Sequence, residues 1–231
     1  MFLFVIVFRA IAALTQGAVP QTTPPPVISR VPVQDKRIAF TFDDGPNVRF
    51  TPQFIALLKS YDAHATFFLI GYEAQQNPQI IRQLNAAGME IANHGMRHRY
   101  LRSDNPELAT QEVREGERAI LSAGVSRPSL YRLPGGISGP RTRSAVGALG
   151  YRIIGWSIDP RDSIRGTSST QITQTVLRHA APGTIVLMHD GPATGREPTL
   201  AALRHIIPAL EAKGYKICSV GELLRTARAA S

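Results

Sequence analysis

The sequence predicts an α/β protein in which about seven β-α units surround a parallel sheet. From Arg37 onward, short apolar runs rich in β-forming residues alternate with longer segments of helical pattern, which indicates repeated β-α units. The chain has 231 residues, which is long enough for one sizeable core, and barrels of this kind commonly occupy roughly 200 to 250 residues. We therefore expect one barrel-sized domain.

Seven apolar runs are the expected strands. They occupy residues 37–42, 65–70, 89–93, 129–132, 151–156, 184–189 and 215–220. Six helices are expected in the intervening segments. Their approximate limits are 50–60, 78–87, 106–123, 141–149, 170–180 and 198–213.

Three of the expected helices carry local signals in their sequence. Asn77, which precedes a proline, is expected to cap one of them, and Gly88 is expected just past its end. The helix near 106–123 also opens with a cap and a proline, although Gly116 lowers its helix propensity. In the last helix, Pro208 is expected to produce a kink.

The beginning of the chain differs in composition from the rest. Residues 1–20 are apolar apart from Arg9 and then become polar, which resembles the hydrophobic region of a signal peptide, or a short anchor. We interpret them as an export signal, so the expected location is secreted, periplasmic or in the cell envelope. Membrane contact is expected only through this segment, if it is not cleaved. Residues 21–35 are proline-rich and are expected to form an extended linker before a domain at 36–231.

Charge and cysteine content restrict the partners and the chemistry. The formal net charge of +9 favours polyanions such as nucleic acid, anionic lipid or an acidic cell-wall polymer. The basic residues are scattered and form no nucleic-acid module, so no nucleic-acid partner is expected. Cys218 is the only cysteine, which excludes an internal disulfide and predicts a buried structural thiol. The sequence does not set the oligomeric state, and a monomer is assumed.

Polar side chains of catalytic types follow five of the expected strands. In a parallel barrel the loops after the carboxyl ends of the strands converge, and active sites lie there. The side chains at these strand ends are Asp43, Asp44, His94, His98, Arg132, Asp159, Asp162, His189 and Asp190. Structural need alone does not explain five such strand ends, so we expect the active site at this edge.

Two motifs supply metal-binding residue types. TFDDGP places Asp43 and Asp44 side by side before a Gly-Pro turn, so one carboxylate is available to a metal while the other faces water; an ordinary Asp-Gly turn is the alternative. NHGMRH places His94 and His98 four residues apart, close enough to share one ion if the loop begins a helical turn. Two histidines with one carboxylate are a known catalytic zinc set that leaves a position open for water.

Two further motifs supply candidates for proton transfer and positioning. IVLMHDGP places His189, a candidate proton donor or a neutral core residue, at the end of an apolar strand. Leu187 lies on the same face as a candidate pocket wall, or as core filling. YRLPGG supplies Arg132, a candidate partner of Asp43, and Gly135, whose backbone N–H is a candidate oxyanion donor; a loop with a solvated arginine is the alternative.

Taken together, five motifs resemble those of the polysaccharide deacetylase family, which is also called the NodB-homology domain or carbohydrate esterase family 4. They are TFDDGP, HGMRH, RLPGG, SIDPRD and LMHD, and the resemblance covers about residues 36–225. It implies a distorted (β/α)7 barrel with parallel strands and an active site at their C-terminal ends. It also implies a bound divalent metal, most often zinc.

The resemblance assigns roles to the matching positions. Asp43 resembles the general base of the family, and His189 resembles the general acid. The metal ligands are matched by Asp44, His94 and His98. The implied reaction is hydrolysis of an acetyl group by an activated water, with protonation of the leaving amine or alkoxide.

Four more positions match supporting residues of the family. Arg132 matches the arginine that tethers the base, and Asp162 matches the carboxylate that tunes the acid. Gly135 matches the backbone oxyanion donor, and Leu187 matches the wall of the acetyl pocket.

Three positions depart from the family pattern. Gly95 stands between the metal histidines where Ser or Thr is usual, which removes a side-chain hydrogen bond and is expected to loosen the loop. Gly135 replaces a common aromatic residue, and Ser163 stands where tryptophan is frequent. We expect these last two changes to widen the groove and remove stacking surface.

The sequence therefore predicts an N-deacetylase acting on N-acetylglucosamine units of peptidoglycan, chitin oligomers or an exported polysaccharide. O-deacetylation of a polymer such as acetylated xylan is an alternative, and so is a carbohydrate-binding barrel that has lost catalysis. A metalloprotease is less consistent with the sequence, because the histidine pair contains no glutamate of the H-E-x-x-H type.

Overall fold

The computed structural model describes residues 23–191 and 195–229, and its centre is one parallel β-sheet. The order of the strands in the sheet is β1-β6-β5-β4-β3-β2-β7, and β8 pairs with the beginning of β2. The strands are β1 (Val27–Ile28), β2 (Arg37–Asp43), β3 (Thr66–Leu69), β4 (Glu90–Asn93), β5 (Leu130–Tyr131), β6 (Arg152–Ile154), β7 (Ile185–His189) and β8 (Lys216–Cys218). All seven runs predicted to be strands contain one, and β1 is additional.

The sheet curls, so that the segments after β1 and β6 approach β7. Beyond β6, Ile158 forms a parallel bridge with Val186 of β7, and the backbone N–H of Leu187 donates to the carbonyl of Ile158 at 2.9 Å. Just before β7, Thr184 forms an antiparallel bridge with Arg30, which follows β1. Because these contacts are two isolated bridges, the barrel is closed on this side by much less pairing than between β2 and β7. The predicted distorted (β/α)7 barrel with parallel strands is confirmed.

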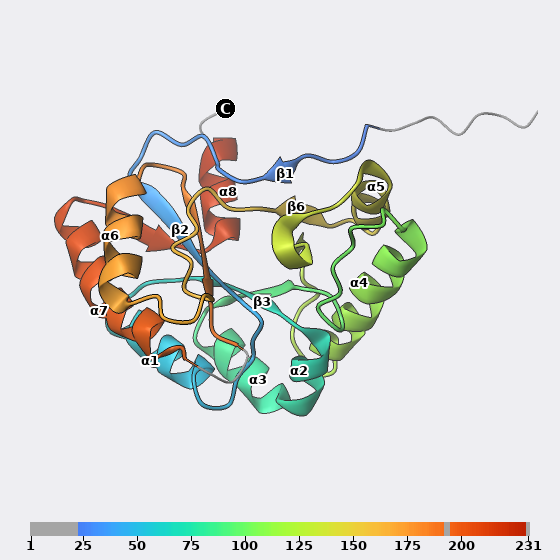
Figure 1. Cartoon of the computed structure of the whole chain (residues 1–231), viewed down its shortest axis with the longest axis horizontal. Helices are drawn as coiled ribbons and strands as arrows, with labels where there is room; N and C mark the ends of the chain where they lie inside the picture. Colours follow the sequence, from blue (N-terminus) through green and yellow to red (C-terminus); the bar gives the residue numbers. More distant parts are fainter. Residues whose placement is uncertain (1–22, 192–194, 230–231) are drawn as a thin grey trace, which may run out of the picture.

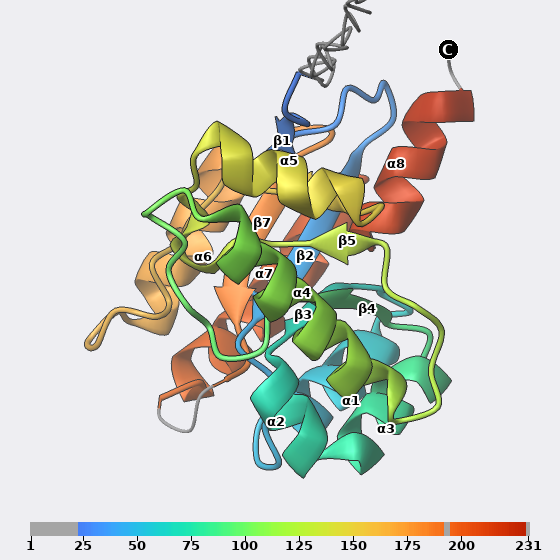
Figure 2. The same cartoon turned by 90° about the vertical axis from the view of Figure 1, so that its right-hand side faces the viewer.

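Eight α-helices surround the described sheet (Figures 1 and 2). They are α1 (Thr51–Ser60), α2 (Gly71–Gln76), α3 (Pro78–Ala86), α4 (Pro106–Leu121), α5 (Pro140–Ala148), α6 (Ser169–His179), α7 (Glu197–Ala212) and α8 (Val220–Ala229). The six predicted helices are all present, whereas α2 and α8 were not anticipated. None of these helices combines the length and the apolar character that a membrane crossing requires, within residues 23–191 and 195–229.

The predicted helix signals are only partly realised. Gly88 follows α3 with a φ of +73°, a backbone conformation that suits glycine, as expected. Asn77 occupies the N-cap position of α3, but its side chain donates to the carbonyl of Glu73 and does not cap the helix. Asn105 does cap α4, because its side chain accepts from the backbone of Leu108. Helix α7 runs continuously through Pro208.

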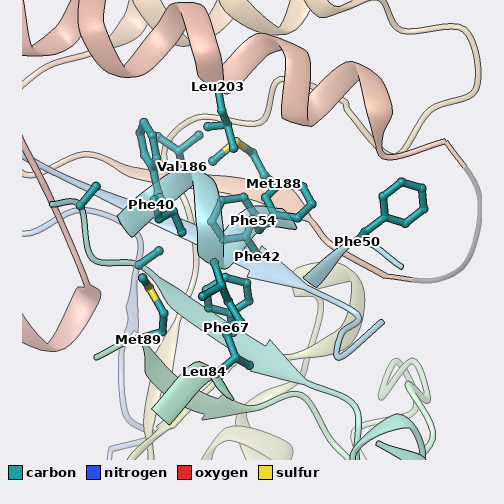
Figure 3. Packing of buried hydrophobic residues seen from close by; sticks show 14 of the residues in the cluster. Phe40, Phe42, Phe50, Phe54, Phe67, Leu84, Met89, Val186, Met188 and Leu203 are labelled. Atoms are coloured by element: carbon teal, nitrogen blue, oxygen red, sulfur yellow. The ribbon is translucent and has the colours of Figure 1, made fainter. Parts of the chain in front are cut away.

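Two apolar layers lie on opposite faces of the curled sheet. Alternate residues of β2 and β7, among them Phe40, Phe42 and Met188, point outward and pack beneath the helices (Figure 3). The opposite face lines the barrel interior, where Phe68 and Cys218 belong to a second buried cluster. Burial raises the pKa of the Cys218 thiol to about 12, so this cysteine is a structural residue, as the sequence predicts.

The barrel interior is covered at the end opposite the strand C-termini. Val220 and Leu223 of α8 pack into the interior cluster, together with Val31 from the segment before β2. That segment falls within the expected linker, and its described part contains β1, which pairs with β6 through Val27 and Ile153. It therefore packs against the barrel. The predicted signal or anchor segment at 1–20 lies outside the described residues.

Gly116 of α4 makes a close approach to the strand-end loop after β4. A Cβ added at Gly116 would lie 2.6 Å from Oδ1 of Asn93 and 2.9 Å from the backbone of Gly95. Gly116 lowers the helix propensity of α4, but packing requires glycine here because α4 and this loop are in van der Waals contact.

We predict that Gly116→Ala destabilises the protein by about 1–3 kcal/mol, although the same change in an open helix stabilises by roughly 0.5–1 kcal/mol. Chemical denaturation of both forms measures the difference. Arg114→Ala, on the exposed face of α4, is the control and should change stability by less than about 0.5 kcal/mol. A Gly116→Ala protein as stable as the wild type would contradict the packing argument.

Candidate active site

The candidate site lies where the carboxyl ends of the parallel strands meet. Asp43 ends β2 and is directly opposite His189, the last residue of β7, in the strand register. His94 follows β4, and its Nε2 is 3.6 Å from Oδ2 of Asp43 and 3.6 Å from Oδ1 of Asp44. His98 Nε2 is 3.3 Å from the same Asp44 oxygen. Side chains from three strand ends therefore share one small volume.

The Asp44, His94 and His98 side chains can hold a metal ion, because one ligand atom from each lies within 4.8 Å of the other two. The Nδ1–H of His94 donates to the Arg132 carbonyl at 2.8 Å, which leaves Nε2 free to act as a ligand. Burial lowers the pKa of His94, which favours the neutral imidazole that metals bind. Asp44 Oδ1 is buried and has no hydrogen-bond partner among the described residues, as expected for an oxygen whose partner is a cation.

The loop that carries the two histidines is not a helical turn. It bends through positive φ values at Gly95 (+83°) and His98 (+53°). Glu112 of α4 holds this bend, since its buried carboxylate accepts from the backbone N–H groups of Met96 (3.0 Å) and Arg97 (2.8 Å). Glu112 was not among the residues expected at the site. A buried acid within an otherwise apolar helix face was the signal that could have found it.

Gly95 does not leave the loop without side-chain support. Its N–H donates to Oδ1 of Asn93 at 2.8 Å, and Asn93 in turn donates to the carbonyl of Val113 in α4. A Cβ at Gly95 would lie 3.2 Å from both Glu112 Oε2 and the Tyr131 hydroxyl. Glycine therefore fits a site crowded by the groups that hold the loop, and the expected loosening is offset by Asn93 and Glu112.

Arg132 is fully buried and connects several strands to the site. Its Nη1 donates to Asp43 Oδ1 and to Thr41 Oγ1, both at 2.7 Å, and its Nη2 donates to the Gly155 carbonyl at 3.0 Å. The guanidinium lies 4.1 Å from the ring centre of Phe68. The predicted pairing of Arg132 with Asp43 is thus present as a buried ion pair.

His189 is oriented by Asp162 from the loop after β6. Its Nδ1–H donates to Asp162 Oδ1 at 2.7 Å, and its backbone N–H donates to Oδ2 at 2.9 Å. Thr199 of α7 donates its hydroxyl proton to the same carboxylate, and the Arg196 side chain donates to the Asp162 carbonyl. Burial alone would lower the pKa of His189, but the hydrogen bond and charge of Asp162 outweigh it, so the pKa is raised.

Asp190 supports the turn that carries the two aspartates. Its carboxylate accepts from the Thr51 hydroxyl, and its backbone N–H donates to the Asp43 carbonyl at 3.1 Å. A Cβ at Gly45 would lie 2.5 Å from this carboxylate, so the turn packs directly against it. Burial raises the pKa of Asp190 to about 7.

Three supporting residues were not anticipated from the sequence, because they belong to helices or helix starts whose contacts with the strand ends are tertiary. They are Thr51, Thr199 and Arg196.

The two candidate substrate-binding positions lie beside this cluster. Leu187 is opposite Thr41 in the strand register, on the same face as Asp43 and His189, and unlike Val186 and Met188 it belongs to none of the core clusters of the described chain. Gly135 is exposed, with a φ of +68°.

The expected loss of stacking surface at Gly135 is not observed. The ring of Tyr100 lies against Gly135, at 2.5 Å from where a Cβ would be, and the ring of Trp156 lies equally close to the adjacent Gly136. Ser163 is exposed. The aromatic surface that is absent from the sequence motif is therefore present in space, contributed by other segments.

Sequence comparison identifies the family of this chain. Residues 30–154 match the polysaccharide deacetylase family. The chain is 40% identical to a peptidoglycan-N-acetylglucosamine deacetylase of Bacillus cereus, over 84% of this chain and 91% of that protein. It is 37% identical to a chitooligosaccharide deacetylase of Bradyrhizobium, over 81% and 90% of the two chains. The chain belongs to the polysaccharide deacetylase family, carbohydrate esterase family 4.

Solved structures agree with this assignment. A peptidoglycan N-acetylglucosamine deacetylase superposes with a TM-score of 0.81 at 30% identity, over 84% of this chain and 91% of that chain. A family 4 pseudoenzyme from Bacillus anthracis also gives a TM-score of 0.81, at 26% identity, over 87% of this chain and 70% of that chain. The fold is therefore shared by an active member and by a pseudoenzyme, so activity must be argued from the site.

We predict that Arg132→Lys destabilises the protein by about 3–5 kcal/mol, because an ammonium cannot satisfy acceptors on β2 and β6 together and leaves Asp43 partly unpaired. Thermal unfolding measures the effect. Arg118→Lys on the exposed face of α4 is the control, with an expected change below about 0.5 kcal/mol. If both variants unfold at the wild-type temperature, Arg132 does not have the structural role described above.

Proposed function

We propose that this protein is a metal-dependent N-deacetylase that removes acetyl groups from N-acetylglucosamine units of a polysaccharide and releases acetate. The observation that carries the proposal is the joint arrangement of a metal-binding triad, an arginine-held carboxylate and a carboxylate-held histidine at one barrel mouth. The names of the relatives, which describe deacetylases of peptidoglycan and of chitooligosaccharides, support this substrate class.

Asp44, His94 and His98 are proposed as the metal ligands, and zinc is the ion that this donor set suits best. When bound, such an ion makes a water molecule more acidic and polarises the carbonyl of the substrate. The two histidines reach the site through Nε2, and the Arg132 carbonyl fixes the orientation of His94.

Asp43 is proposed as the general base. Arg132 holds its Oδ1, which leaves Oδ2 directed toward His94 Nε2 at 3.6 Å and close to the proposed metal position. A carboxylate held in this way is placed to accept a proton from the attacking water, and the buried ion pair prevents it from rotating away.

His189 is proposed as the general acid that protonates the leaving amine, with Asp162 as its positioning residue. The Nδ1–H bond to Asp162 leaves Nε2 to deliver the proton. The Gly135 backbone N–H is proposed to stabilise the developing oxyanion, and Leu187 is proposed to contact the acetyl methyl group. The charges of Asp43 and Asp44 also raise the pKa of His189, which indicates that the proposed acid and base belong to one site.

The alternatives are less well supported. A carbohydrate-binding barrel without catalysis would be expected to lack part of this machinery, whereas base, ligand and acid candidates are all present here. O-deacetylation uses the same groups, and no observation favours it. We further propose that residues 1–20 direct export or anchoring of the protein. The proposed domain comprises residues 36–231 together with β1, which packs against it, and acts in the envelope or outside the cell.

Acetate release from N-acetylglucosamine oligomers by the purified full chain tests the proposal. We expect release that EDTA abolishes and zinc restores, and a loss of at least about 100-fold in Asp43→Asn. Asp62→Asn, at the opposite end of the barrel from the strand C-termini, is the matched control and should retain full activity. If the folded, zinc-loaded protein releases no acetate, the N-deacetylase proposal is wrong, and O-acetylated polymers become the next substrates to assay.

The raised pKa of His189 predicts the alkaline side of the pH profile. Because the general acid must carry its proton, kcat/KM should fall as pH rises through the His189 pKa. Asp162→Asn removes the charge that raises this pKa, so the alkaline limb should move to lower pH. Asp159→Asn, an exposed carboxylate of the same loop, should leave the limb in place. An unchanged limb in Asp162→Asn would exclude His189 as the titrating acid.

A further inference from the structure

Tyr100 has an unusual position for a large aromatic side chain. It follows the two candidate metal ligands of the β4 loop, and 56% of its surface is exposed. Its ring meets the His98 ring edge to face, with centroids 5.4 Å apart, and Arg102 lies over it at 5.4 Å. On its other side it lies against Gly135. A half-exposed tyrosine is thus fixed between a proposed metal ligand and the proposed oxyanion donor.

The position of Tyr100 depends on Gly135 being glycine. The ring atoms Cε1 and Cδ1 of Tyr100 would lie 2.5 and 2.8 Å from a Cβ at Gly135, so any other side chain at this position would displace the ring. The φ of +68° at Gly135 independently favours glycine. The backbone of the oxyanion loop and the Tyr100 ring therefore form one continuous surface.

Most of the exposed large apolar side chains are distributed around the same mouth. Six large hydrophobic residues are exposed in the described part of the chain, and five of them follow the carboxyl ends of successive strands from β2 to β6. These five are Val48, Tyr72, Tyr100, Ile137 and Ile164. Exposed apolar groups gathered at a site mouth indicate a binding surface for an extended ligand. Tyr100 is the aromatic member that contacts the metal loop.

We propose that Tyr100 is a substrate-binding residue whose ring stacks on a pyranose ring of the acetylated glycan and positions the acetamide over the site. This inference rests on the proposed function for the identity of the ligand. The aliphatic C–H groups on one face of a sugar ring fit the electron-rich face of an aromatic ring, and tyrosine combines such a face with a polar tip that stays in water. The ring face, rather than the hydroxyl, carries the interaction.

Binding can be measured without turnover, because Trp156 is the only tryptophan of the chain and lies against Gly136, next to the Tyr100 platform. We propose to titrate the EDTA-treated full chain with the trimer of N-acetylglucosamine and to follow tryptophan fluorescence. Tyr100→Ala should weaken binding about tenfold, and Tyr100→Phe should stay within about twofold of the wild type. Tyr61→Ala is the control and should bind like the wild type, because this partly exposed tyrosine lies just after α1, at the opposite end of the barrel from the strand C-termini.

Kinetics with zinc-loaded protein separate a binding role from a structural one. Tyr100→Ala should raise KM for the trimer about tenfold with kcat within about threefold, and its zinc content should match that of the wild type. Reduced zinc content would mean that the ring acts by holding His98, and this outcome overturns the proposal. Trimer binding that is absent in the wild type, unaffected by Tyr100→Ala, or equally weak in Tyr100→Phe also overturns it.

The two proposals fail separately in these experiments. Binding that depends on Tyr100 without acetate release would contradict the deacetylase activity and leave the stacking role supported. Acetate release that is independent of Tyr100 would contradict only the stacking role.

Discussion

The buried guanidinium of Arg132 is the interaction on which the candidate site depends. It donates to Asp43 at the end of β2 and to the backbone carbonyls of Ile154 and Gly155 at the end of β6. The backbone carbonyl of Arg132 orients His94 from the β4 loop. Phe68 covers one face of the guanidinium inside the barrel. A buried charge is stable only when its partners are in place, so the barrel must close correctly around Arg132 for the ion pair to form. The same contacts of Arg132 therefore accompany barrel closure and orient the proposed base.

A second support comes from outside the barrel, through α4. This helix contributes the Glu112 carboxylate to the loop that carries His94 and His98, and Gly116 allows the helix to approach closely enough to do so. Figure 2 shows α4 between α5 and α2, and α4 packs against both helices. Candidate metal ligands on an irregular loop need such external hydrogen bonds, because the loop has no regular backbone hydrogen-bond ladder of its own.

The aromatic surface of the mouth illustrates how one position can be filled from different parts of a chain. Gly135 and Gly136 leave the backbone of the loop after β5 without side chains, and Tyr100 and Trp156 cover it from two other strand-end loops. In the sequence motif that contains Gly135, the usual aromatic residue is absent from this chain. In three dimensions the aromatic rings remain at the mouth, and Arg102 adds a cation beside one of them. The aromatic surface at the mouth is thus contributed by several loops and not by one motif.

The sequence alone determined the fold class and the composition of the site, because hydrophobic periodicity marks the strands, and parallel strands bring their carboxyl ends to one edge. Asp43 and His189 could be expected together on that argument, since each ends an apolar strand. The tertiary structure showed the role of Glu112, which lies on the next helix along the chain and reaches back to the loop after β4. It also placed Tyr100 over Gly135, two residues from different loops with no shared motif. Periodicity and turn chemistry are local properties, because they depend on residues that are close together in the sequence. Contacts between helices and loops depend on how the whole barrel closes, and no short stretch of sequence contains that information.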